Sequence, residues 1–171
     1  MLQLDTALGA VPSQAGDFGL EQPFDVSDGQ RDVRDDHRIV VERLNSLKDF
    51  EIALRLKTTS SNAKGGVALR LLTPSDYYAV QINAMNDKIV FARVSHGKYD
   101  EIVAAQSAIG DAWHSLTIRA QDNRFSVTLD GKWLFTAYDT VLSRPGQVTL
   151  WTSTHGAIEF DGVSVQPLGP E

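Results

Sequence analysis

The chain of 171 residues contains no cysteine. Disulfide bridges, thiolate nucleophiles and metal centres with cysteine ligands are therefore excluded. No hydrophobic run approaches the roughly 20 residues that a membrane-spanning helix needs. Residues 1–17 lack a basic segment and carry Asp5 early, so as written they are not a signal peptide. These absences leave a folded domain without covalent cross-links as the expected class.

Positive charge is also scarce. Lysine and arginine number 16 against 22 aspartates and glutamates, which gives a formal net charge of -6 at pH 7. Acidic proteins repel phosphate backbones and anionic headgroups, so neither nucleic acid nor a membrane is an expected partner. The length and a hydrophobic content of 42% suffice for a single domain with a sizeable core.

No segment has the pattern of a long amphipathic helix. Hydrophobic and polar residues alternate instead, which is typical of strands with one buried face. The Asp130-Gly131 pair adds a strong signal for a tight hairpin turn. The predicted strands cover 38–44, 50–57, three strands within 65–98, and then 99–105, 114–120, 125–129, 132–137, 147–152 and 157–166. The sequence thus predicts one all-β domain over 1–171, with an irregular N-terminal part over 1–45 and a core sandwich over 50–166.

The most informative stretch runs from Gly65 to Lys98. Val67, Leu69 and Leu71 are expected to face the core, and the opposite face carries amide, phenol and guanidinium groups. Planar amides and guanidinium groups can hydrogen-bond the hydroxyls of a sugar in a fixed geometry. The alternative is an ordinary solvated sheet face with cross-strand pairs.

Further residues extend this candidate site. Trp151 alternates with Leu150, so one of the two side chains points away from the core. If that side chain is Trp151, its ring would offer a stacking platform for a sugar. The candidate ligand-binding residues are Arg55, Arg70, Tyr77, Gln81, Asn83, Arg93 and Trp151.

Four sequence pieces occur in a characteristic order. They are GGVALRLLTPSDYYAVQINAMNDKIVFARVSHGK, DAWHSLTIRAQDNRFSVTLDGKWLF, PGQVTLWT and FDGVSV, within Phe50–Val165. This order resembles the bacterial laminin-G-like, concanavalin A-like lectin/glucanase jelly-roll domains, especially the 3-keto-disaccharide hydrolase domain family. The resemblance implies a two-sheet antiparallel jelly-roll sandwich and, as one alternative, an enzyme that acts on a modified disaccharide. The polar and aromatic face of the central strands predicts glycan recognition on the concave sheet. It also favours an extracellular or periplasmic location.

The usual catalytic groups of this fold are missing from the sequence. Glycosidases need two carboxylates, which laminarinase-like members carry as E-x-D-x-x-E on one strand, and this motif is absent. Alginate lyases of the fold carry Q-I-H where this chain has Gln81-Ile82-Asn83. We therefore assign no catalytic residue and expect non-catalytic glycan binding. The alternatives are a glycoside hydrolase or lyase acting on a modified disaccharide or polysaccharide, and a protein-interaction module.

The resemblance also implies a structural Ca²⁺ ion on the convex side. Asp161 in the FDG motif occupies the corresponding position, with Asp25 or Asp28 as conceivable partners. Calcium needs six to eight oxygen ligands, of which these residues supply only a few. The alternative is that Asp161 simply hydrogen-bonds a turn.

Overall fold

The computed structural model describes residues 2–4, 37–40, 46–153 and 158–169. These residues form no helix, and so none that is long and apolar enough to cross a membrane. The strands are β1 (Leu2–Leu4), β2 (His37–Val40), β3 (Phe50–Thr58), β4 (Lys64–Thr73), β5 (Asp76–Asn83), β6 (Lys88–Ser95), β7 (Lys98–Gln106), β8 (His114–Gln121), β9 (Arg124–Leu129), β10 (Lys132–Tyr138), β11 (Gln147–Ser153) and β12 (Ile158–Pro167). Most of the predicted irregular part, 1–45, lies outside the described residues.

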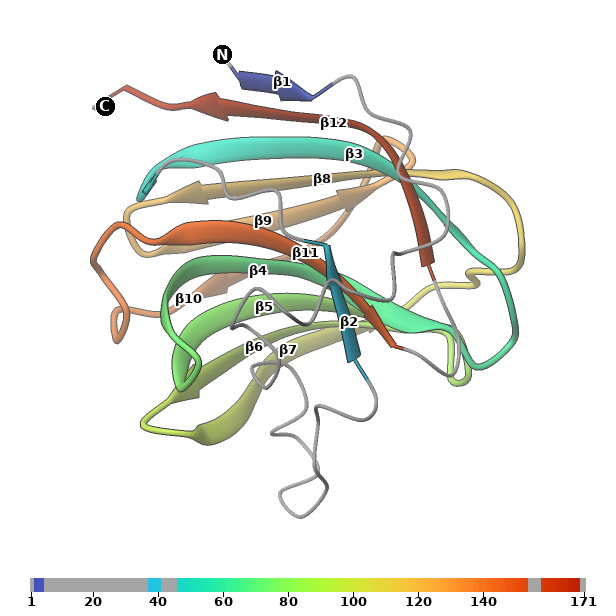
Figure 1. Cartoon of the computed structure of the whole chain (residues 1–171), viewed down its shortest axis with the longest axis horizontal. Coiled ribbons are helices and arrows are strands. Elements are labelled where there is room, and N and C mark those ends of the chain that lie inside the picture. The colour runs from blue at the N-terminus through green and yellow to red at the C-terminus, as the bar shows by residue number, and fades with distance from the viewer. Residues whose placement is uncertain (1, 5–36, 41–45, 154–157, 170–171) are drawn as a thin grey trace.

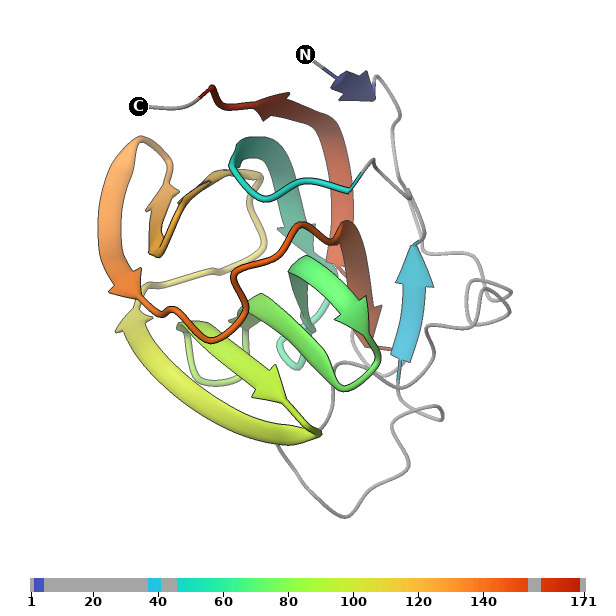
Figure 2. The ribbon, with the colours of Figure 1, turned by 90° about the vertical axis from the view of Figure 1, so that its left-hand side faces the viewer.

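The strands form two stacked sheets (Figures 1 and 2). Sheet A has the order β1-β12-β3-β8-β9-β10, and sheet B has the order β2-β11-β4-β5-β6-β7. Every pairing is antiparallel. The predicted all-β, two-sheet antiparallel sandwich is confirmed.

Hydrophobic side chains from both sheets fill the space between them. On β3, Phe50 and Ile52 are fully buried, and on β5 the same holds for Val80 and Ile82. Burying one such side chain contributes about 1.5–3 kcal/mol, so this alternation is the main source of stability. A second buried cluster lies on the other, outer face of sheet B, and its members are Ala68, Leu71, Tyr77, Ala79, Val94 and Trp151. We call it the outer cluster.

The predicted hairpin turn is present between β9 and β10. Asp130 and Gly131 both have positive φ, at 52° and 78°. Two consecutive residues with positive φ are what a type I′ turn requires, and its twist matches that of the flanking strands. The tight turn predicted from the Asp-Gly pair is therefore confirmed.

One prediction about the sheet faces is wrong, because β4 contains an irregularity. Its register against β5 shifts between Leu69 and Thr73, and Arg70 has a φ of 49°. A β-bulge inserts an extra residue and so reverses the alternation of side chains beyond it. Leu71 consequently belongs to the outer cluster instead of the main core, and Arg70 is 0% exposed.

Candidate functional site

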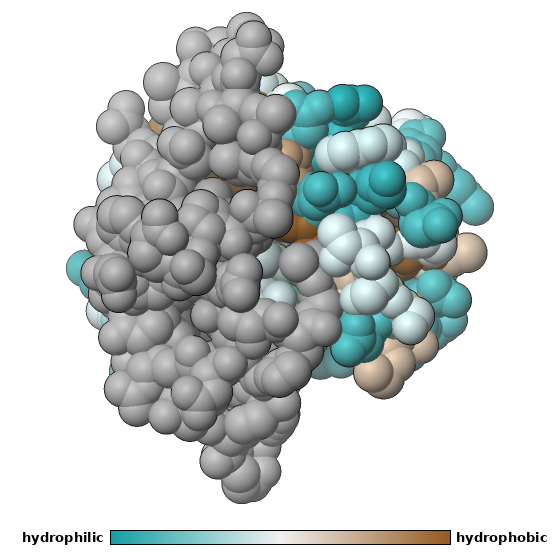
Figure 3. All heavy atoms as spheres, turned by 45° about the vertical axis from the view of Figure 1, so that its right-hand side comes forward, coloured by the Kyte–Doolittle hydropathy of each residue, from teal (hydrophilic) through white to brown (hydrophobic). Residues whose placement is uncertain are grey.

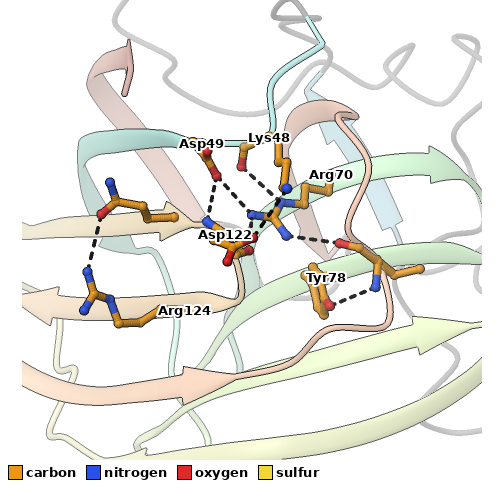
Figure 4. A network of polar contacts seen from close by, with 8 residues as sticks. Lys48, Asp49, Arg70, Tyr78, Asp122 and Arg124 are labelled. Atoms are coloured by element: carbon orange, nitrogen blue, oxygen red, sulfur yellow. Dashed lines mark hydrogen bonds and ion pairs between the residues drawn. The ribbon is translucent and has the colours of Figure 1, made fainter. Parts of the chain in front are cut away.

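Arg70 connects three loops inside the sandwich (Figure 4). The guanidinium group donates to the backbone carbonyls of Lys48, Leu142 and Asp122 at 3.0, 3.1 and 2.7 Å. The carboxylate of Asp49 lies 3.6 Å from the same group. Because all its donors are directed at the protein, Arg70 acts as a structural clamp. Its predicted place on the polar sheet face is corrected accordingly.

Arg55 lies on the other sheet of the sandwich. It projects from β3 of sheet A, where its guanidinium group pairs with Asp161 and lies 4.9 Å from the ring centre of Trp113. The strand alternation indicated that Arg55 faces away from the core, but it could not indicate which sheet β3 joins. Arg55 is therefore far from the predicted glycan face.

The calcium prediction centred on Asp161 stays a prediction. Its carboxylate has Arg55 as an ion-pair partner, and the suggested partners Asp25 and Asp28 lie outside the described residues. Within the described part of the chain, no group of three or more His, Asp or Glu residues could hold a metal ion.

Arg93 also points away from the outer face of sheet B. It stands opposite Tyr78 in the β5–β6 pairing, on the side of the core. Its guanidinium group pairs with Asp139 and lies 3.1 Å from Asp100. Arg93 thus links β6 to β7 and to the segment that follows β10. The prediction that Arg93 joins the glycan face is corrected.

Tyr77 and Trp151 both face away from the main core, which the alternation indicated for Tyr77 and left open between Leu150 and Trp151. They are only 1% and 0% exposed, however, and both belong to the outer cluster. Burial in an apolar cluster leaves no open ring surface for a sugar to stack on. The structure places Trp151, and not Leu150, on the side away from the main core, but its burial leaves the expected stacking platform closed.

Gln81 and Asn83 are the two predicted residues that the structure brings together. They occupy alternate positions on β5, so both side chains lie on the outer face of sheet B. Both line a cavity of about 260 Å³, which we call the sheet B cavity. Its lining residues are Lys64, Gln81, Asn83, Asn86, Lys88, Val90, Tyr99 and Glu101.

The register of three strands builds this cavity. Asn83 stands opposite Lys64 of β4 on one side and Lys88 of β6 on the other. In the next row, Gln81 stands opposite Gly66, where β4 and β5 approach so closely that a Cβ atom would lie 1.9 Å from the carbonyl oxygen of Val80. Because neighbouring strands are about 4.8 Å apart, the first row places one amide between two ammonium-bearing side chains.

Polar contacts around the cavity fix several of its groups. The Tyr99 hydroxyl donates to Gln81 Oε1 at 3.4 Å, and Lys88 Nζ lies 3.2 Å from a Glu101 oxygen. Burial, together with the charge of Glu101, raises the pKa of Tyr99 to about 12. The phenol is therefore a protonated hydrogen-bond donor at neutral pH. Asn83 Oδ1 accepts the backbone N–H of Met85 at 3.0 Å, which leaves the amide NH₂ group as the donor for a ligand.

Two larger cavities lie among loops at the ends of the sandwich, and neither includes a predicted site residue. The larger of these two, about 600 Å³, is lined by residues from 58–61, 84–87 and 108–111. Two of its polar side chains hold the loops: Thr58 donates to the carbonyl of Gly110 at 2.5 Å, and Asp87 accepts from the N–H of Ile109 at 3.2 Å. Size alone therefore does not make it the better binding site.

His114 has a structural environment. Its Nδ1 lies 2.6 Å from an Asp130 oxygen and its Nε2 lies 2.5 Å from the carbonyl oxygen of Ile109. Burial alone would lower the pKa of His114, but the hydrogen bonds to both acceptors and the charge of Asp130 raise it above its ordinary value. The protonated ring can donate to both acceptors at once, whereas the neutral ring can donate to only one.

This arrangement predicts a stability that depends on pH. The folded-state pKa of His114 lies above the unfolded value of about 6.5, so the stabilisation is complete below that pH. It is lost as the pH rises through the folded-state pKa. The prediction concerns the difference in the free energy of unfolding between the parent chain and His114→Gln. We expect this difference to be larger at pH 5.5 than at pH 9 by on the order of 1 kcal/mol, the usual contribution of one charge-assisted hydrogen bond.

Chemical denaturation of both chains across this pH range checks the prediction. His96→Asn is the matched control, because His96 is exposed in the β6–β7 turn and donates its backbone N–H, which the substitution keeps, to Asp76. A difference between parent and His114→Gln that stays constant with pH would contradict the proposed role of the imidazolium.

The fold is shared with solved structures of several proteins. The carbohydrate-binding module CBM66 from Bacillus subtilis superposes with a TM-score of 0.69 at 20% identity, covering 77% of this chain and 83% of that one. Sheep galectin-11 gives 0.58 at 12% identity, with 75% and 95% covered. The β-glucanase of Bacillus licheniformis gives 0.57 at 11%, with 78% and 71% covered. The chain therefore has the lectin/glucanase type of jelly-roll fold.

Comparison with protein-family models and with curated protein sequences gave no match. Identities at or below 20% to the solved structures speak for the fold alone.

Proposed function

We propose that this chain binds a carbohydrate in the sheet B cavity without transforming it. The observation that carries the proposal is the row of neutral and charged hydrogen-bonding groups on three adjacent strands, with the amides of Gln81 and Asn83 at its centre. Amides, a phenol and ammonium groups can donate to and accept from neighbouring sugar hydroxyls. One protein of similar fold is a carbohydrate-binding module, which supports this use of the fold.

The lining of the cavity favours binding over hydrolysis. Glycosidases need two carboxyl groups on either side of the scissile bond. Among the described residues that line the cavity, Glu101 is the one carboxylate, and it is paired with Lys88. A phenol with a pKa near 12 is also a poor general base at neutral pH. These features favour recognition over a glycosidase-like or lyase-like reaction.

The visible surface does not favour the third alternative, a protein-interaction module. On the side shown in Figure 3, the described residues are mainly hydrophilic, and hydrophobic residues show only in small areas between them. Protein-binding sites more often present a contiguous apolar patch.

Calorimetric titration with a panel of oligosaccharides tests the proposal. The panel holds β-glucan fragments, neutral disaccharides, their 3-keto derivatives and acidic oligosaccharides; the 3-keto sugars are included because of the resemblance noted in the sequence. We expect Gln81→Ala and Asn83→Ala each to weaken binding about three- to tenfold, because each removes a hydrogen-bonding amide from the cavity.

Gln166→Ala is the matched control, because Gln166 is an exposed amide on β12 of the opposite sheet. Its affinity should equal that of the parent chain, and all three variants should keep the parent's melting temperature. The proposal fails if no panel member binds, or if a bound sugar is indifferent to both cavity substitutions.

A further inference from the structure

The sheet B cavity differs in charge from the chain as a whole. The chain carries a formal charge of -6, yet the lining of the cavity holds two lysines and one carboxylate. Lys88 is neutralised by Glu101 at 3.2 Å. Lys64 forms no hydrogen bond or ion pair through its side chain with another described residue. Within the described part of the chain, the positive charge of Lys64 at the cavity is therefore not compensated by a carboxylate.

We propose that the ligand of this cavity is an acidic saccharide and that Lys64 is the partner of its negative charge. This inference rests on the proposed function, and it adds the chemical class of the sugar. A neutral sugar would offer the ammonium group of Lys64 only hydroxyl oxygens, which carry no opposite charge. A carboxylate on the sugar ring would instead gain a charge-assisted hydrogen bond, which is stronger than a neutral one.

The position of Lys64 suits this role. Lys64 and Lys88 flank Asn83 in one cross-strand row, so their Cα atoms are about 10 Å apart, or two strand spacings. An acidic group entering this row meets the ammonium group of Lys64 and the amide NH₂ of Asn83 together. The hydroxyls of the same sugar ring then lie toward Gln81 and Tyr99, which belong to the same cavity.

A matched pair of ligands tests the inference on the full chain. One is a neutral gluco-oligosaccharide, and the other is the same oligosaccharide oxidised at C6 to the glucuronate. We expect the oxidised form to bind about fivefold more tightly at 20 mM salt. At 0.5 M salt the preference should fall below about twofold, because ions screen an attraction between partly exposed charges.

Substitution of the lysine makes the test specific. In Lys64→Gln the two ligands should bind equally, whereas Lys132→Gln, an exposed lysine on β10 of sheet A, should keep the parent's preference. A third ligand with a C6 sulfate in place of the carboxylate distinguishes the two sources of negative charge: tight binding that also depends on Lys64 would extend the class to sulfated sugars.

The outcomes separate the two proposals. Equal binding of the neutral and oxidised sugars by the parent chain, or a preference that survives Lys64→Gln, overturns the inference and leaves the proposed function standing. Failure of every ligand to bind overturns both.

Discussion

Replacing Arg70 by methionine is expected to lower the free energy of unfolding by about 3–5 kcal/mol, the usual effect of removing one partner from a buried charged network. Arg70 is 0% exposed and supplies donors to three backbone carbonyls in three separate loops. Without it, the three carbonyls lose this donor, and the buried carbonyl of Leu142 costs about 1–3 kcal/mol when nothing replaces the hydrogen bond. Arg70→Lys should be nearly as destabilising, because one ammonium group cannot reach three carbonyls that the planar guanidinium fork spans.

Chemical denaturation followed by tryptophan fluorescence measures this effect. Arg119→Met is the control, because Arg119 is an exposed arginine on β8 whose ion pair with Glu51, at 3.3 Å, should contribute about 0.2–1 kcal/mol at most. Equal losses in the two methionine variants would contradict the clamp role. An Arg70→Met chain that kept its stability but lost sugar binding would show that Arg70 is a ligand-binding residue.

Gly66→Ala is expected to have the second large effect. A Cβ atom at this position would lie 1.9 Å from the backbone carbonyl oxygen of Val80, and Gly66 has a φ of 155°. A backbone atom in the middle of a sheet cannot move away as a flexible side chain can. Overpacking typically lowers stability by 1–3 kcal/mol, and we expect about 3 kcal/mol here because β4 and β5 must separate locally.

The same separation would disturb the sheet B cavity, since Gly66 stands opposite Gln81. Denaturant midpoints for Gly66→Ala and for Gly169→Ala check the prediction. Gly169 is the control, as a Cβ added there meets no atom within 4 Å. A midpoint for Gly66→Ala within error of the parent's would show that the strands are not packed as closely as described.

The strands were predictable because the alternation of hydrophobic residues is a local signal. From Phe50 onward each predicted strand is present, with ends shifted by one or two residues. The direction of Trp151, opposite to Leu150, followed from the same alternation. Its burial did not, because burial depends on what packs over the face of a sheet.

The position of Arg70 was not predictable from alternation, because a bulge changes the phase of a strand without a distinct residue pattern. Arg55 and Arg93 were misplaced for other reasons. Which sheet β3 joins is set by its distant partners β8 and β12, and Arg93 lies on the core side opposite Tyr78. The core-side position of Arg93 was predictable from the alternation, because Phe91, two residues earlier on the same strand, is a core residue.

Two of the eight residues that line the sheet B cavity were predictable from one strand. Gln81 and Asn83 share a face because they are two residues apart. Lys88 could also have been found, since the short turn after Asn83 places the two residues opposite each other. The positions of Lys64 and Glu101 in the cavity depend on the register of the β4–β5 and β6–β7 pairings. Each of these pairings contains a register shift that no local sequence pattern predicts.

The central claim is that a sugar binds in the sheet B cavity, and backbone and side-chain amide NMR tests it most directly. The chain is titrated with the tightest-binding sugar of the panel. The account predicts that the largest shifts occur at Gln81, Asn83 and Lys88, side-chain amides included. Shifts confined to 58–61 and 108–111, which line the larger loop cavity, would contradict it.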